Sequence, residues 1–232
     1  MSGVEMPKKV YYWQLKGGLA PSCCLLEMAD AKVEFEFFTG YEDWHAVRDA
    51  VPGRFATGLL PAMELADGSV VSESGAVKRT IAAATGRLGS GKDFMISESL
   101  MGINDDLKKL VGQDAPNVMN LGLMGGGPKT WNDESKAKCE EVRPKISEKL
   151  GKIANMLLEG KDRFTASGET CGEVDLFWTL YTMESGPHPG LLGPLQAFYT
   201  RLHANAGITR YIEGTGTYST PQTPNWLMPM PA

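Results

Sequence analysis

LLPAMELADGSVVSESGAV, residues 59–77, is the stretch of sequence that decides the fold. Two short apolar runs, residues 62–65 and 70–71, flank the turn sequence ADGS, and this pattern predicts a β-hairpin. Ser72 or Ser74 can then cap a following helix of small and apolar residues, because a serine at the N-cap accepts a hydrogen bond from the first turn.

Pro61 stands directly before the first predicted strand. A proline cannot donate to a sheet ladder, so it fits the first position of a strand or an edge strand. The alternative use of a proline here is a cis peptide bond, which reshapes the backbone beside a ligand. The stretch is therefore either an ordinary hairpin with a capped helix or a hairpin that forms part of a binding site.

The residues before the hairpin predict alternating strands and helices. KVYYW, residues 9–13, has the aromatic and β-branched composition of a strand. KVEFEFF, residues 32–38, alternates apolar and charged residues, as a half-buried strand does. Helices are expected over residues 21–31 and 43–50, so the order through the helix after the hairpin is β-α-β-α-β-β-α.

The second part of the chain predicts helices alone, after a glycine-rich linker at residues 84–93. The expected helices cover residues 94–111, 132–158, 172–184, 191–204 and 207–213. The fold class is thus α/β plus all-α, with an α/β domain over residues 8–85 and an all-helical domain over residues 94–215. A proline-rich tail over residues 216–232 is expected to drape over the surface or to be disordered.

Composition limits the possible partners and the compartment. The 232 residues carry a formal charge of -5, which gives no argument for nucleic acid or an anionic membrane as partner. No apolar run approaches the roughly 18 residues of a membrane span, and the first ten residues lack the apolar core of a signal peptide. Four cysteines do not make a secreted disulfide framework, and three scattered histidines do not predict a metal site. We therefore expect a cytoplasmic protein without a bound metal.

The element order and several motifs resemble the cytosolic glutathione transferases, most closely those of the sigma class. VYYWQLKGG is similar to the family's first strand with its catalytic tyrosine, here Tyr12. LLP is similar to the cis-proline motif, which gives Leu60 and Pro61, and ESGAVKRTIA resembles the Gln/Glu-Ser motif, which gives Glu73 and Ser74. The resemblance covers most of the chain and implies a thioredoxin-like fold for the first domain.

Further binding residues follow from the same resemblance. EDWHAVRDAVP resembles a segment that holds the glycyl carboxylate of glutathione, here through Trp44 and Arg48. Lys16 stands where the family has the first arginine of an Arg-Gly-Arg motif. INDDL resembles the site where an aspartate, here Asp106 or Asp105, reaches the glutathione of the neighbouring subunit, so the resemblance implies a homodimer.

The implied chemistry is ionisation of the glutathione thiol. A free thiol has a pKa of about 8.5, so ionising it at pH 7 takes a shift of roughly two units, or about 2.7 kcal/mol. A neutral Tyr12 hydroxyl that donates to the sulfur favours the thiolate. Ser74 suits the α-carboxylate of glutathione and Glu73 the ammonium beside it. The expected activity is conjugation of glutathione, a co-substrate without any further cofactor, to small hydrophobic electrophiles, with isomerase or peroxidase side activities.

The helical domain adds two expectations by resemblance. GEVDLFW resembles the buried capping segment of the family, with Asp175 as its anchor. By the family's layout, residues 117–130 lie at the mouth of the electrophile pocket, so Met119 and Met124 are expected to shape substrate choice as adaptable apolar walls.

Two other functions stay open. A non-catalytic relative that keeps the fold as a binding or structural protein, as lens crystallins do, is favoured by the absence of the second arginine, where the sequence has Gly18. A thiol-disulfide oxidoreductase would use Cys23 or Cys24. In such enzymes the reactive cysteine lies at the N-terminus of a helix, where its pKa is lowered, whereas this pair is expected one turn inside the helix.

Overall fold

The computed structural model describes residues 4–14, 17–114, 133–159, 161–185 and 188–219. Its contacts divide the chain into two compact units. The first, called here the sheet unit, contains the described residues up to Gly89 and those from Asn205 onward. The second, the helical unit, runs from Ser90 to Ala204.

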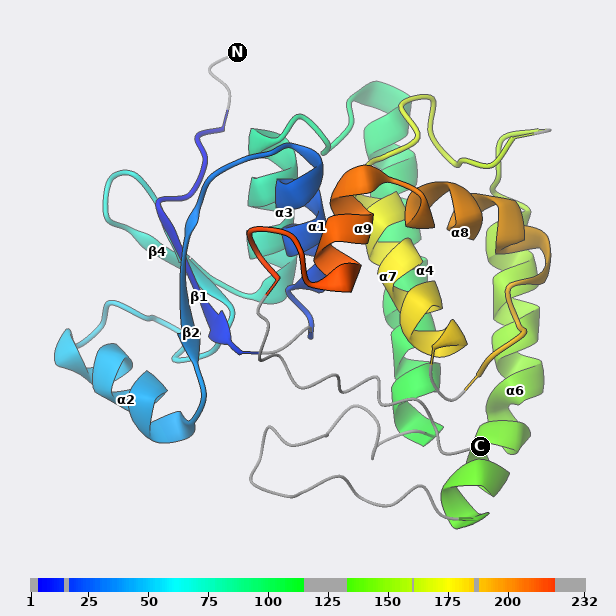
Figure 1. The fold of residues 1–232 in the computed structure, drawn as a ribbon, viewed down its shortest axis with the longest axis horizontal. Helices are drawn as coiled ribbons and strands as arrows, with labels where there is room; N and C mark the ends of the chain where they lie inside the picture. Colours follow the sequence, from blue (N-terminus) through cyan, green and yellow to red (C-terminus); the bar gives the residue numbers. More distant parts are fainter. Residues whose placement is uncertain (1–3, 15–16, 115–132, 160, 186–187, 220–232) are drawn as a thin grey trace. The chain divides into compact units, whose positions relative to one another are not determined.

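A four-stranded sheet with helices packed on it forms the sheet unit (Figure 1). Its first seven elements are β1 (Lys9–Trp13), α1 (Ala20–Met28), β2 (Glu34–Phe38), α2 (Tyr41–Ala50), β3 (Ala62–Glu64), β4 (Val70–Ser72) and α3 (Ser74–Ala84). The spatial order is β2-β1-β3-β4, with β1 and β2 parallel and β3 antiparallel to both of its neighbours. This arrangement confirms the predicted thioredoxin-like fold and the α/β plus all-α fold class.

Alternation along β1 sends its two adjacent tyrosines to opposite faces of the sheet. Tyr11 lies on the α2 side, and its ring packs in a buried aromatic cluster. The members of this cluster, named the Tyr11 cluster here, are Tyr11, Phe38, Trp44, Phe55 and Ala62. The Tyr11 hydroxyl donates to Glu64 Oε2 at 3.0 Å, and Arg54 Nη2 donates to the same oxygen at 2.6 Å. Tyr11 is thereby held as part of the core, and Tyr12 faces the other side.

The last helix, α9 (Ala206–Glu213), belongs to the sheet unit and packs along α1 (Figure 1). Gly207 makes this approach possible, because a Cβ atom there would lie 2.5 Å from the backbone nitrogen of Met28. Arg210 Nη2 also donates to the carbonyl of Glu27 at 2.7 Å. Residues 207–213 were expected in the all-helical domain, whereas the contacts place this helix in the sheet unit. Gly207 allows this because α9 can lie closer to α1 than a side chain would permit.

The expected tail begins with residues that are fixed to the sheet unit. The Tyr218 N–H donates to Glu27 Oε1 at 2.7 Å, and the Tyr218 hydroxyl accepts a hydrogen bond from the Val33 N–H at 2.8 Å. Tyr218 and Ser219 are both buried, so this part of the tail is neither draped nor disordered. The tail residues after Ser219 lie outside the described residues.

Helices α4 and α7 pack against each other at the centre of the helical unit, and α6 packs on α4 (Figure 1). The elements of this unit are α4 (Gly91–Asp114), α6 (Asp133–Ala154), α7 (Cys171–Glu184), a short 3₁₀ helix η1 (Gly193–Leu195) and α8 (Gln196–His203). Because α7 is buried along most of its length, it forms the core of the unit. Of the helices that the structure describes, none is both long enough and apolar enough to cross a membrane.

The N-terminus of α7 is capped by two residues, one directly before the helix and one in its first turn. Thr170 and Glu173 form a capping box, in which Glu173 Oε2 accepts a hydrogen bond from the Thr170 N–H at 3.1 Å. Asp175, the expected anchor of this segment, is buried inside the helix and accepts hydrogen bonds from Asn104 Nδ2 at 2.7 Å and Lys108 Nζ at 2.8 Å. Asp175 therefore joins α7 to α4, whereas Thr170 and Glu173 make the cap.

His188 is a buried histidine between α7 and η1. Within the described residues, neither of its ring nitrogens has a hydrogen-bond partner. Burial, and after it the positive charge of Arg143, lower the pKa of His188 from 6.5 to about 4, against the opposing effect of Glu140. The unfolded protein therefore binds more protons at this residue than the folded protein does between pH 6.5 and about pH 4.

The free energy of unfolding is expected to fall as the pH drops through this window, by up to about 3 kcal/mol from His188 alone. Above pH 6.5, the unperturbed pKa of histidine, His188 is neutral in both states and the folded protein has the full stability. This stability is lost as the pH falls towards 4. Urea denaturation at a series of pH values measures the slope. His188→Leu should remove most of it, and His203→Gln, at an exposed histidine of the same unit, should leave it unchanged. A His188→Leu slope equal to that of the wild type would assign the titration to another group.

Candidate functional site

The strand register brings three separate sequence motifs to one end of the sheet. Tyr11 of β1 pairs with Ala62 of β3, and Ala62 pairs with Ser72 of β4. Because β3 runs opposite to β1 and β4, the carboxyl ends of β1 and β4 lie beside the start of β3. The next residues at this end are Tyr12, Pro61 and Glu73.

Tyr12 lies near the end of β1 and is 6% exposed. Burial raises the pKa of its phenol to about 12, and the backbone N–H groups of Gly18 and Leu19, which donate to its oxygen, oppose this rise. Tyr12 is therefore neutral at pH 7. Because the oxygen accepts from two N–H groups, its own hydrogen is left for a further acceptor.

Gly18 and Leu19 belong to the candidate site, although no motif in the sequence predicts them. They act through backbone N–H groups, so their side chains carry no signal of this role. Leu19 is the N-cap residue of α1, and N–H groups at the start of a helix have no partner within it. Only the position of this loop, directly between the tyrosine and the helix, could have indicated that its backbone lies near the tyrosine hydroxyl.

The Leu60–Pro61 peptide bond is cis, which confirms the prediction made for Pro61. The Glu73 N–H donates to the Pro61 carbonyl at 3.2 Å, and this hydrogen bond joins the start of β3 to the end of β4. Leu60 packs against the Tyr11 cluster and is partly buried. The backbone of the hairpin thus links Pro61 directly to the residue that begins the next motif.

Glu73 and Ser74 are both exposed at the N-terminus of α3. Glu73 is the N-cap residue, in place of the expected Ser72 or Ser74, and among the described residues its side chain makes no capping hydrogen bond. Its φ is 85°, a conformation that costs a non-glycine residue about 1–3 kcal/mol and that clusters at ligand sites. A carboxylate and a hydroxyl are therefore exposed beside the partially positive end of a helix.

Trp44 and Arg48 are placed differently from each other on α2. Trp44 is 2% exposed, and its ring lies 5.4 Å from that of Phe38 and 4.9 Å from that of Phe55, measured between ring centroids. The ring belongs to the core because α2 must cover its face of the sheet with apolar surface. Arg48 is partly exposed and binds the Asp49 carboxylate at 2.7 Å.

Asp105 and Asp106 are exposed on α4, where both pair with lysines of the helical unit. Asp106 Oδ2 lies 3.1 Å from Lys149 Nζ of α6, and this contact holds the pKa of Asp106 below its usual range. Asp105 Oδ1 lies 3.4 Å from Lys108 Nζ. The approach of either aspartate to a neighbouring subunit stays a prediction. Lys16, Met119 and Met124, with the rest of residues 117–130, lie outside the described residues.

Cys23 and Cys24 lie inside α1 and are 3% and 0% exposed. Burial raises the pKa of Cys23 to about 12, although a hydrogen bond from the Tyr211 hydroxyl lowers it. A thiol in this position is protonated at pH 7 and closed to a substrate. The burial of this pair therefore argues against a thiol-disulfide oxidoreductase that uses Cys23 or Cys24.

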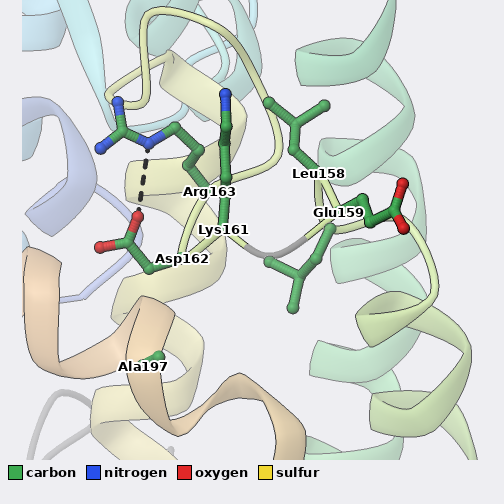
Figure 2. Close-up of a pocket in the computed structure, with 7 residues that line it drawn as sticks. Leu158, Glu159, Lys161, Asp162, Arg163 and Ala197 are labelled. Carbon is green, nitrogen blue, oxygen red and sulfur yellow. Dashed lines mark hydrogen bonds and ion pairs between the residues drawn. The ribbon is translucent and has the colours of Figure 1, made fainter.

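A depression of about 780 Å³ lies in the helical unit, and Figure 2 shows the residues around it. Its lining residues are Leu157, Leu158, Glu159, Lys161, Asp162, Arg163 and Ala197. Two carboxylates balance two cations in this set, and Arg163 Nε lies 3.3 Å from Asp162 Oδ1. None of the residues at the end of the sheet lines this depression, so it is not the candidate site.

The chain is similar to known proteins in its structure. No protein-family model and no curated protein sequence matches the chain. The sigma class GST of Fasciola hepatica matches with a TM-score of 0.66 at 22% identity, over 88% of this chain and 94% of that one. A glutathione S-transferase of Caenorhabditis elegans gives 0.67 at 21%, over 90% and 98%. Rat hPGDS complexed with a quinoline gives 0.66 at 17%, over 88% and 95%.

These matches extend over nearly the whole length of each compared structure. At identities of 17–22% they report on the fold, and they confirm at that level the resemblance seen in the motifs. The chain therefore has the fold of the cytosolic glutathione transferases, with a sigma-class enzyme among its structural neighbours.

Proposed function

We propose that this protein is a glutathione transferase that binds glutathione at the carboxyl end of β1 and activates its thiol through Tyr12. The thiolate would attack small hydrophobic electrophiles, with isomerase or peroxidase side activities. The observation that carries the proposal is the meeting of Tyr12, the cis Leu60–Pro61 bond and Glu73 at one end of the sheet. Structural neighbours that are titled as glutathione transferases support it.

Tyr12 would donate a hydrogen bond to the sulfur of glutathione. With a pKa of about 12 it keeps its proton at pH 7, so it acts as a donor and not as a base. The N–H groups of Gly18 and Leu19 polarise its hydroxyl from the oxygen side. Donation to the sulfur stabilises the thiolate relative to the thiol and lowers the thiol pKa, and the released proton passes to solvent.

Glu73 and Ser74 would bind the γ-glutamyl end of glutathione. The Ser74 hydroxyl and the free N–H groups of the first turn of α3 suit an α-carboxylate, which the positive end of the helix also favours. The Glu73 carboxylate suits the ammonium on the same carbon, since it can only accept hydrogen bonds. The left-handed backbone of Glu73 fits this role, because such strain persists where a site requires a particular geometry.

The remaining contacts would extend along the tripeptide. Leu60 would pair its backbone with the cysteinyl part as an added strand. Trp44, through its indole N–H, and Arg48 would hold the glycyl carboxylate, and Lys16 would add a positive charge. Asp106 would come from the neighbouring subunit of a homodimer. We assign the activity to the cytoplasm, without a nucleic-acid or membrane partner.

Ser74→Ala is expected to weaken glutathione binding about 10- to 100-fold, because a hydrogen bond to a charged group contributes about 1.5–3 kcal/mol. Isothermal titration calorimetry with glutathione measures this loss. Ser69→Ala is the matched control, since Ser69 lies in the β3–β4 turn at the other end of the hairpin and bonds Asp67 Oδ1 at 2.6 Å. Equal affinity of Ser74→Ala and the wild type would contradict the assignment of Ser74.

A further inference from the structure

We infer that the C-terminal segment, residues 205–219, positions the Tyr12 hydroxyl by holding α1 in place. The effect of this positioning on catalysis rests on the proposed function. The positioning itself can be tested in the protein without glutathione. The segment consists of α9 and the residues after it, and it lies within the sheet unit together with α1 and β1. It would make residues near the end of the chain part of a site formed at its beginning.

The C-terminal segment is attached to the carboxyl end of α1 by polar contacts. Arg210 Nη2 donates to the Glu27 carbonyl at 2.7 Å and to Asp30 Oδ1 at 2.8 Å, and Arg210 Nε lies 3.5 Å from Glu27 Oε2. The Tyr218 N–H donates to Glu27 Oε1 at 2.7 Å. Glu27 is only 4% exposed, so its carboxylate depends on these two partners. Loss of Arg210 would leave a buried charge without its counter-charge, which is strongly unfavourable.

The backbones of α1 and the C-terminal segment also lie in close contact. Gly207 and Gly216 each lie where a Cβ atom would collide, the first with the Met28 backbone and the second with the Glu27 carboxylate. Packing this close leaves little room for α9 to shift relative to α1. The carboxyl end of α1 is therefore fixed both by polar contacts and by shape.

Helix α1 in turn connects the C-terminal segment to Tyr12. Residues Ala20–Glu27 are all buried, so the helix moves as one body in the core. The backbone at the start of α1 lies beside the Tyr12 oxygen, since a Cβ atom at Gly18 would be 3.7 Å from it. The N–H groups of Gly18 and of the N-cap residue Leu19 act on this oxygen as hydrogen-bond donors. In the middle of α1, the thiol of Cys23 accepts a hydrogen bond from the Tyr211 hydroxyl of α9 and neighbours the Tyr12 phenol. A displacement of α1 at Glu27 would thus move Gly18, Leu19 and Cys23, the described residues that act on the Tyr12 phenol.

Arg210→Met tests this chain of contacts in the free protein. The readout is the backbone amide resonances of Gly18 and Leu19 in two-dimensional NMR, assigned with the help of Tyr12→Phe. Arg163→Met is the matched control, because it removes an Arg–Asp pair of the helical unit, with Arg163 Nε 3.3 Å from Asp162 Oδ1. Tyr211→Phe is a milder second variant that removes only the hydroxyl, for the case that Arg210→Met does not fold.

We expect Arg210→Met and Tyr211→Phe to shift both amide resonances, Arg163→Met to leave them in place, and Arg210→Lys to restore them in part. Unchanged resonances in both variants of the C-terminal segment would overturn the inference. With glutathione bound, Arg210→Met should raise the thiol pKa and lower kcat about tenfold, because a 1 Å misplacement of a positioned group can cost about 100-fold and a smaller shift is expected here. Its affinity for S-methylglutathione, which has no thiol, should be that of the wild type.

The two proposals fail in different ways. A wild-type protein that binds glutathione without lowering its thiol pKa would remove the proposed function, and the amide comparison would still decide whether residues 205–219 position Tyr12. A normal thiol pKa shift in the wild type that persists in Arg210→Met and Tyr211→Phe would keep the proposed function and overturn this inference.

Discussion

Replacing Tyr12 by phenylalanine is expected to lower the rate of glutathione conjugation about 100-fold, the size typical of losing one donor to a developing anion. The phenol keeps its hydrogen at pH 7, and the hydrogen bond it gives to sulfur is the contribution that phenylalanine cannot replace. The loss should lie in kcat and in the pH at which the thiol ionises. Steady-state kinetics with a reactive aromatic electrophile across pH measures both quantities.

Tyr11→Phe is the matched control for this substitution. It removes a hydroxyl from the adjacent residue on the opposite face, where Tyr11 bonds Glu64 at 3.0 Å. We expect a loss of about 1 kcal/mol in stability, as for an ordinary hydrogen bond, and a rate near that of the wild type. A Tyr12→Phe variant as active as Tyr11→Phe would exclude Tyr12 as the donor.

Gly172→Ala is expected to destabilise the helical unit by about 3 kcal/mol or more, at the upper end of overpacking effects. A Cβ atom at Gly172 would lie 2.9 Å from the Ser97 carbonyl carbon and closer still to its oxygen. The obstacle is backbone of α4 and cannot rotate away as a side chain could. The substitution would also disturb the hydrogen bond from the Gly172 N–H to Ser97 Oγ at 2.9 Å. Urea denaturation followed by circular dichroism measures the change.

Gly102→Ala provides the comparison on α4 itself. Among the described atoms nothing lies within 4 Å of a Cβ atom built there, and the residue is exposed. Alanine should therefore stabilise this helix by up to about 1 kcal/mol through its better helix propensity. If Gly172→Ala and Gly102→Ala unfolded at the same urea concentration, the close approach of α4 and α7 at Ser97 would be contradicted.

Local patterns in the sequence predicted most of the helices and strands, because side-chain alternation and turn residues determine where these begin and end. KVYYW was expected as a strand over residues 9–13, and β1 covers Lys9–Trp13. The hairpin and the helix after it follow from the same rules. The cis bond at Pro61 came from a motif and not from local chemistry, since a trans proline is equally compatible with a strand start.

Tertiary contacts explain what the sequence could not predict. The ring of Trp44 packs between Phe38 and Phe55, and the fold alone brings these aromatic neighbours to it. Asp106 pairs with Lys149, a residue that α6 brings from far along the chain. The attachment of α9 to α1 depends on Gly207, whose effect is a missing side chain and therefore has no hydrophobic pattern.

In the candidate site, too, some residues could be predicted from local motifs and others depend on tertiary contacts. Motifs identified Tyr12, Glu73 and Ser74, and the strand register shows that Tyr12 and Glu73 reach one end of the sheet. The groups that orient the Tyr12 hydroxyl are backbone N–H groups of Gly18 and Leu19. Almost every residue type has such a group, so the sequence does not indicate this role. The side chains of such a site are therefore easier to predict from a sequence than the backbone groups that orient them.

The most direct test of the proposed activity is the ultraviolet difference absorbance of the thiolate during a glutathione titration, repeated across pH with the wild-type protein. We predict that the thiolate of bound glutathione appears well below the pKa of a free thiol, which is about 8.5. Saturable binding in which the bound thiol titrates at the value of free glutathione would contradict the account and would make this protein a glutathione-binding relative without transferase chemistry.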